Sequence, residues 1–213
     1  MRALFASAVV GVAACSTPPP PLAPTGGVAQ TTARVVVEPV ALAFVSSSHD
    51  DPAPPAVAVL GAGEGPRTRI LLRFDPPAGM KAAPLKAYLV LERAKGALAG
   101  PLPVTLSTER VTEPWSVADG LRTSWNTPPA SEPLLSATVA TRGSAPIRID
   151  VTEWAQALAK PTKGKIKSWG LRIEAKGEGY GLPIATGYGG GTAPILELYL
   201  PAPLIITAPA SST

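Results

Sequence analysis

Prolines and glycines are spread through the whole chain, and they set the strongest limit on its fold. The sequence contains 26 prolines and 20 glycines among 213 residues, which is well above average usage. Proline removes a backbone donor and clashes with the preceding helical turn, and glycine weakens helix interiors. A helical bundle or a doubly wound α/β fold is therefore not expected. A chain of this length forms one domain, or at most two.

Short segments between these breaks alternate apolar and polar residues. In segment 68–74, Ile70, Leu72 and Phe74 share one face. The same period of two recurs in segments 86–92, 147–151, 169–176 and 195–200. Half-buried strands show this period because successive side chains point to opposite faces of a sheet. Many short strands separated by turns predict an all-β fold, a β-sandwich of the jelly-roll type.

One short helix is expected after the strand at 147–151. Asp150 is a good N-cap residue, and Glu153 follows three residues later, as in a capping box. Lys160 and Pro161 end the segment. The apolar stripe of this helix consists of Trp154, Ala157 and Leu158. We expect the helix to close one end of the sandwich.

The first fifteen residues have the pattern of a bacterial lipoprotein signal peptide. Arg2 is basic, the apolar run at 3–12 is too short to span a bilayer, and small residues precede Cys15. Cys15 is the only cysteine. Small residues before a single cysteine resemble the lipobox of bacterial lipoproteins. An ordinary secretory signal with a chance cysteine is the alternative.

The lipobox resemblance implies a lipid anchor and a cell-envelope location. Residues 1–14 would be removed, the Cys15 thiol would take a diacylglyceryl group, and the new amine would be acylated. Two or three acyl chains anchor a protein stably, where one does not. Ser16 stands where an aspartate commonly retains lipoproteins in the inner membrane. The outer membrane is therefore the expected location.

The rest of the chain divides into a tether, a domain and a tail. Segment 15–33 contains four consecutive prolines and a Gly-Gly pair, which favour an extended and then flexible spacer. Segment 34–203 contains the predicted strands and forms the β-sandwich domain. Segment 204–213 is expected to be a loose tail.

Six motifs occur in an order that resembles one known domain family. The motifs are Arg69-Ile70-Leu71-Leu72-Arg73-Phe74-Asp75, Ala87-Tyr88-Leu89-Val90-Leu91, Thr123-Ser124-Trp125-Asn126-Thr127-Pro128-Pro129, Asp150-Val151-Thr152-Glu153-Trp154, Trp169-Gly170-Leu171-Arg172-Ile173 and Pro194-Ile195-Leu196-Glu197-Leu198. Together they resemble the DNRLRE domains, also called disaggregatase-related repeats, over about residues 41–200. The resemblance implies a secreted or surface-displayed jelly roll. Some members are carbohydrate-binding modules, including ones for acidic polysaccharides such as alginate, and others have no known ligand.

Composition excludes several other functions. The net charge is +4 and charged residues make up 16% of the chain, so strong nucleic-acid binding is not expected. One histidine and one cysteine exclude most zinc sites, disulfides and histidine-based catalysis. His49 with its neighbouring serines and aspartates lies in one loop, where nothing holds a catalytic triad. We expect no enzyme, although a polysaccharide lyase that uses tyrosine and arginine stays open.

Four arginines are the first candidates for ligand binding. Arg69, Arg73, Arg148 and Arg172 lie on the polar faces of separate predicted strands. If those strands are neighbours, the guanidinium groups form a patch suited to uronate or sulfate groups. The alternative is an ordinary solvated sheet face.

Three aromatic residues are further candidates. Trp115 follows a Glu-Pro pair and is the tryptophan that we most expect to be exposed. Burial in the core is an equally favoured alternative. Tyr180 and Tyr188 are flanked by glycines, as suits adaptable recognition loops. Plain hairpin turns are the alternative for both tyrosines.

Calcium is the one cofactor that the sequence suggests. Asp50 and Asp51 offer adjacent carboxylates in a loop, and hard oxygen ligands are what calcium prefers. A solvated turn before Pro52 is the alternative, and no other cofactor is expected.

The combined hypothesis is a cell-envelope lipoprotein that displays a non-catalytic, carbohydrate-binding-like β-sandwich, with an acidic polysaccharide as the ligand. The alternative is a structural lipoprotein that contacts envelope proteins and binds no glycan. A buried Trp115 and scattered arginines would favour that alternative.

Overall fold

The computed structural model describes residues 32–48, 55–61, 67–75, 77, 80, 82–96, 102–117, 124–159, 168–176, 181–189 and 191–201. Cys15, Asp50, Asp51 and Tyr180 lie outside these residues, as do segment 1–14, nearly all of the tether and the tail. The predictions for those positions stay predictions. Among the described residues, no helix is long and apolar enough to cross a membrane.

The described chain is built from strands and a single helix, as the alternation predicts. The strands are β1 (Thr32–Val37), β2 (Ala41–Ser46), β3 (Val57–Leu60), β4 (Thr68–Arg73), β5 (Lys86–Leu91), β6 (Val104–Val111), β7 (Ser131–Val139), β8 (Ile147–Asp150), β9 (Leu171–Lys176), β10 (Leu182–Ala185) and β11 (Ile195–Pro201). The helix is α1 (Thr152–Ala159).

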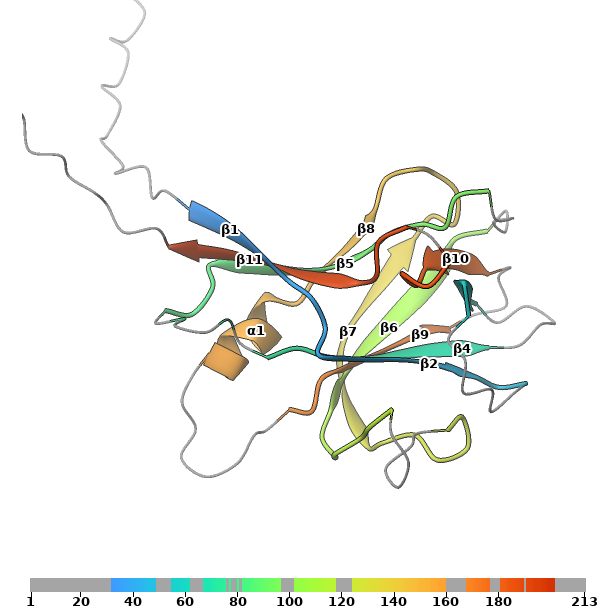
Figure 1. Ribbon diagram of the computed structural model, residues 1–213, viewed down its shortest axis with the longest axis horizontal. Helices are drawn as coiled ribbons and strands as arrows, with labels where there is room; N and C mark the ends of the chain where they lie inside the picture. The colour runs from blue at the N-terminus through green and yellow to red at the C-terminus, as the bar shows by residue number, and fades with distance from the viewer. Residues whose placement is uncertain are drawn as a thin grey trace, which may run out of the picture.

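These strands form two main sheets and one small sheet (Figure 1). The four-stranded sheet has the order β1-β11-β5-β8, and the five-stranded sheet has the order β2-β4-β9-β6-β7. Strands β10 and β3 pair separately. All neighbouring strands are antiparallel. The all-β sandwich is therefore confirmed, and the jelly-roll type stays a prediction.

The core lies between the inner faces of the two main sheets. Leu89 and Leu198 come from the four-stranded sheet, and Ile70, Leu106 and Ile173 come from the five-stranded sheet; all five are at most 2% exposed. All of them except Leu106 are apolar positions of the predicted period-two segments. Burial of such side chains stabilises a fold by about 1.5–3 kcal/mol each. The pleat therefore places one face of each of these strands in the core.

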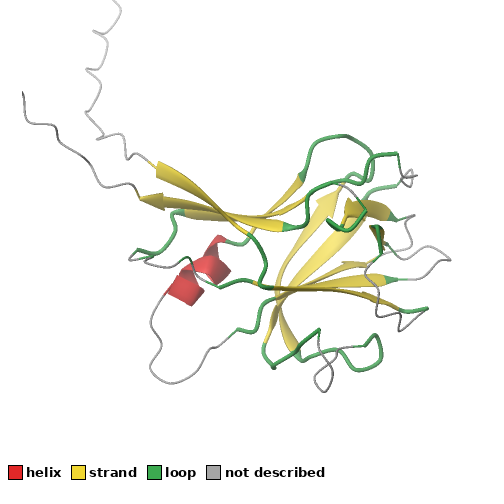
Figure 2. Cartoon of the chain, in the orientation of Figure 1, coloured by secondary structure: helices red, strands yellow, loops and turns green. Residues whose placement is uncertain are grey.

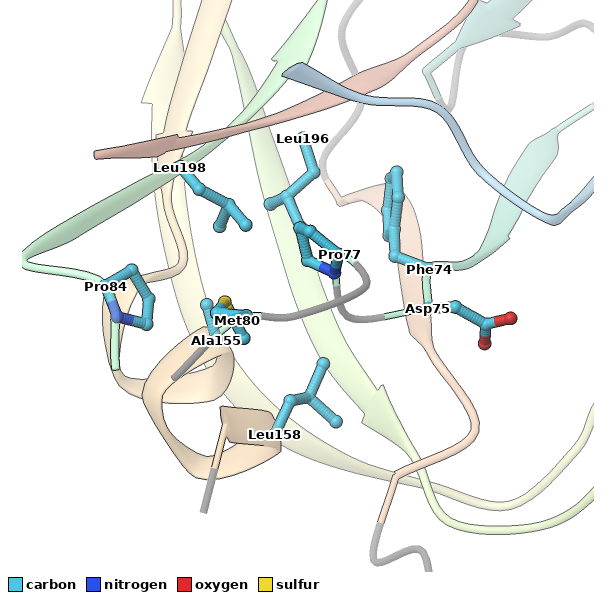
Figure 3. A pocket seen from close by; sticks show the side chains of 9 residues that line it. All are labelled: Phe74, Asp75, Pro77, Met80, Pro84, Ala155, Leu158, Leu196 and Leu198. Carbon is cyan, nitrogen blue, oxygen red and sulfur yellow. The ribbon is translucent and has the colours of Figure 1, made fainter. Parts of the chain in front are cut away.

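Helix α1 closes one end of the sandwich (Figure 2). The Asp150 carboxylate accepts a hydrogen bond from the backbone N–H of Thr152 at 3.0 Å, which confirms Asp150 as a cap. The capping-box contact of Glu153 stays a prediction. Trp154 is buried against Phe74, with ring centroids 6.3 Å apart. A small apolar notch separates α1 from β11, and Leu158 and Leu196 are among the side chains around it (Figure 3).

A second, smaller apolar cluster covers the outer face of the five-stranded sheet. Leu71, Val111 and Trp115 are buried there, and Trp125 and Trp169 pack against them. The segment after β6 therefore folds back over this face of the sheet. As a result, this outer face is partly a core surface and not an open binding platform.

Candidate binding face of the four-stranded sheet

The four arginines predicted as one patch are divided between the two main sheets. Arg69 and Arg73 lie on β4 and Arg172 lies on the adjacent β9, all in the five-stranded sheet. Arg148 lies on β8, in the four-stranded sheet. The prediction of a single patch is wrong, because β8 lies in a different sheet from β4 and β9. The alternation of residues along each strand does not determine the order of the strands.

Arg69 is engaged within the protein. Its Nε donates to Glu174 Oε2 at 2.9 Å, and its Nη1 donates to the Trp125 carbonyl at 2.8 Å. The guanidinium carbon lies 3.7 Å from the centroid of the Trp125 ring. Such stacking on an indole is a cation–π contact. Arg69 thus fastens the segment around Trp125 onto the sheet.

Arg172 has a comparable structural role. It pairs with Glu109 on the adjacent β6, and its Nη1 donates to the Pro129 carbonyl at 3.5 Å. Burial alone would raise the pKa of Glu109, but the Ser131 hydroxyl and Arg172 hold that pKa below its ordinary value. The contacts of Arg69 and Arg172 make both residues parts of the scaffold.

Arg73 remains partly exposed at the end of β4, opposite Ala41.

Trp115 is buried, so its prediction as an exposed ligand-binding residue is wrong. The side chain is 2% exposed, and its Nε1 donates to the Trp169 carbonyl at 2.7 Å. A tryptophan N–H that leaves water needs such a partner. Trp115 anchors the segment after β6 and is not available to a ligand.

Arg148 belongs to an open cluster on the outer face of the four-stranded sheet. The cluster is centred on Glu197 of β11, which is only 3% exposed. Arg148 of β8 and Arg34 of β1 both pair with this carboxylate, one from each side. Burial by itself raises the pKa of Glu197, but the two arginines hold it below its ordinary value. One anionic side chain therefore positions two cationic side chains.

Two tyrosines complete this cluster. Tyr88 and Tyr199 meet edge to face, with ring centroids 6.0 Å apart and an interplanar angle of 87°. The Arg148 guanidinium carbon lies 4.7 Å from the Tyr88 centroid. Arg148 Nη2 also donates to the Tyr199 hydroxyl at 3.1 Å. The result is a set of fixed aromatic and guanidinium groups on one sheet surface.

We call this set the arginine–tyrosine face. Its members, together with a flanking lysine–aspartate pair, are Arg34, Lys86, Tyr88, Arg148, Asp150, Glu197 and Tyr199. The face contains three cations, Arg34, Lys86 and Arg148, and two carboxylates. Glu197 pairs with both arginines, and Asp150 pairs with Lys86 at 3.0 Å. The side chains of Arg34, Lys86 and Arg148 are 54%, 55% and 42% exposed. The face therefore keeps an excess positive charge and unused N–H donors that solvent can reach.

Sequence reasoning found Arg148 but missed the other members. The available signal was Glu197, a carboxylate between the buried Leu196 and Leu198 in a strongly apolar strand. A nearly buried carboxylate requires a cationic partner. Which cations supply it depends on the strands that flank β11, and only the folded chain shows these.

Tyr188 is exposed in a different place. It lies in the connection between β10 and β11, is 61% exposed, and borders a groove of about 520 Å³. The Thr186 hydroxyl donates to the Pro55 carbonyl at 2.6 Å, and the Tyr188 N–H donates to that hydroxyl at 3.3 Å. Among the described residues that line the groove, Glu38 is the charged one. This groove does not suit a polyanion.

The described residues contain no group of three or more histidine, cysteine, aspartate or glutamate side chains placed to hold a metal. Asp50 and Asp51 lie outside those residues, so calcium binding there stays a prediction.

Comparisons with known proteins give no assignment. No family model matches the chain, and no curated protein matches it. The resemblance to the DNRLRE domains therefore rests on the six sequence motifs alone.

Proposed function

We propose that this protein is a cell-envelope lipoprotein, anchored through Cys15 at the outer membrane, that displays a non-catalytic binding module of the jelly-roll type. The module binds an acidic polysaccharide through the arginine–tyrosine face. The membrane is its partner through the lipid anchor, and nucleic acid is not.

One observation supports this function above the others: Glu197 holds two solvent-accessible guanidinium groups in fixed positions. Guanidinium groups recognise carboxylate and sulfate groups through paired N–H donors. Tyrosine rings offer an apolar surface with a polar edge, against which a sugar ring packs. The DNRLRE resemblance supports the same ligand class. No chemical step is part of the proposal, because binding alone needs only these fixed groups.

The test is retention of the chain from Ser16 to Thr213 on immobilised polygalacturonate and dextran sulfate, with neutral dextran as the reference. We expect retention on the two acidic polymers at low salt and its loss as salt screens the charges. The decisive variant is Arg148→Gln, which should reduce affinity by about tenfold, the value of one charged hydrogen bond.

Arg110→Gln is the matched control. Arg110 is also a partly exposed arginine paired with a glutamate, Glu132, but it lies in the five-stranded sheet. Equal loss in both variants would show that only net charge matters and would contradict the assigned face. No retention by either acidic polymer at low salt would overturn the proposal.

A second candidate is a structural lipoprotein that contacts other envelope proteins. The burial of Trp115 and the division of the arginines between two sheets favour it. A pull-down from envelope extracts would support this candidate if Arg148→Gln abolished capture of a protein while the acidic polymers gave no retention.

A further inference from the structure

Strand β1 is the least protected edge of the two main sheets in the described part of the chain. Four strands lie at the edges of the two main sheets: β1, β8, β2 and β7. Strand β7 contains Pro133 and faces a register shift in β6, and β8 has only four residues. Strand β2 is largely half-buried. Proline, irregularity and short length are the usual protections of a sheet edge.

The composition of β1 suits pairing with another strand. Thr32–Val37 contains neither proline nor glycine, and most of its residues are exposed. Val36 is 47% exposed although it lies within a run of three valines. β-Branched residues favour extended backbone, and an open edge presents unpaired N–H and C=O groups. Strand β1 therefore has both the side chains and the backbone groups that a further strand would use.

We propose that two copies of this chain associate through β1, as an antiparallel pair of β1 strands centred on Val36. In this register Val36 faces Val36 of the second copy, and Arg34 faces Glu38 of the second copy. Glu38 is exposed and directly follows β1. The twofold symmetry makes this charge pair occur twice, as in isologous interfaces.

The charges select this register over those centred on Arg34 and Val35. A pair centred on Arg34 would place two like charges directly opposite each other, which is destabilising. A pair centred on Val35 would place Arg34 against Val36 and Glu38 against Thr32, with no charge pair. Arg34 can serve both Glu197 and the second copy, because it contacts Glu197 through Nη2 alone and a guanidinium has five N–H donors.

Such a pair would join the two four-stranded sheets into one continuous sheet. The arginine–tyrosine faces of both copies would then lie on the same surface, where one polymer chain could cross both. This last consequence rests on the proposed function, whereas the association itself does not.

The first test is cysteine cross-linking in the chain from Ser16 to Thr213. This chain has no cysteine of its own, because Cys15 is the only one in the sequence. Val36→Cys should form a disulfide-linked dimer under mild oxidation, since directly opposite residues of antiparallel strands are close enough for a disulfide. Val59→Cys, at a similarly exposed valine on β3, is the control for random collisions. Cross-linking at position 36 that is no faster than at position 59 would overturn the proposal.

The second test is sedimentation equilibrium of the unmodified chain and of Glu38→Lys. The substitution places a lysine opposite Arg34 twice in the dimer, so we expect dimerisation to weaken by about tenfold or more. Glu38 is exposed, so the variant should fold normally. A monomer at all concentrations for the unmodified chain, or equal dimerisation of both proteins, would contradict the assigned interface. Because neither test uses a polysaccharide, failure here is distinct from failure of the proposed function.

Discussion

Arg148 reaches Glu197 across an intervening strand. Arg148 lies on β8 and Glu197 on β11, with β5 between them. The guanidinium crosses the ring of Tyr88 on β5 and pairs with the buried carboxylate beyond it. One arginine thereby connects three strands on the outer face of the sheet. This contact holds the candidate site together and gives rise to measurable consequences.

The stability of the protein should fall in acid. The pKa values of Glu197 and Glu109 are both held below the ordinary glutamate value. A group with a depressed pKa in the folded state stabilises the fold above its unfolded pKa, and this contribution is lost as pH falls through the folded pKa. Denaturant unfolding at a series of pH values should show a decline that begins near the ordinary glutamate pKa. Glu197→Gln should show a smaller decline; an unchanged acid dependence would refute this account.

Substitutions of Arg172 and Arg148 should separate an effect on stability from an effect on binding. Arg172→Gln breaks a mostly buried pair with Glu109 and should lower the free energy of unfolding by about 2–3 kcal/mol. Arg148→Gln removes a more exposed group and leaves Glu197 paired with Arg34, so it should cost less, about 1 kcal/mol. Among variants that fold, Arg148→Gln should reduce retention on acidic polymers more than Arg172→Gln does. The opposite pattern would mean that the binding face lies on the five-stranded sheet.

Trp115 should behave as a core residue. Trp115→Ala should lower the free energy of unfolding by about 3–5 kcal/mol through the cavity that it leaves. Trp115→Phe keeps most of the packing but leaves the Trp169 carbonyl without its donor, at a cost of about 1–2 kcal/mol. Urea unfolding curves measure both. A ligand-binding Trp115 would instead lose affinity in both variants with little change in the unfolding midpoint.

Gly170 should tolerate no side chain. Its φ is +124°, and a Cβ there would lie 1.9 Å from the Leu72 carbonyl oxygen on β4. Gly170→Ala should therefore lower the unfolding free energy by about 3 kcal/mol or more, or prevent folding. Gly143 has almost the same φ of +125° with open space around it, so Gly143→Ala measures the backbone strain alone. Equal losses in the two variants would show that the close contact with Leu72 has no effect.

The sequence alone determined the class of the fold and the positions of β4, β5, β8, β9 and β11. Alternation in 68–74, 86–92 and 195–200 predicts β4, β5 and β11, because a strand with one buried face must repeat every two residues. The cap at Asp150, just before the helix that begins at Thr152, also followed from local chemistry, since an N-cap involves residues only two or three positions apart. These features depend on neighbours along the chain, and the sequence contains that information directly.

Tertiary structure alone decided which residues face one another. Arg69, Arg148 and Arg172 look equivalent in sequence, yet two hold the scaffold and one lies on the open face, because β4 and β9 belong to one sheet and β8 to the other. Trp115 was undecided in sequence, and its burial depends on a segment that folds back over the five-stranded sheet. Arg34 and Glu197 are 163 residues apart in sequence. Their pairing follows from strand order, which is a property of the whole packed chain and not of any local pattern.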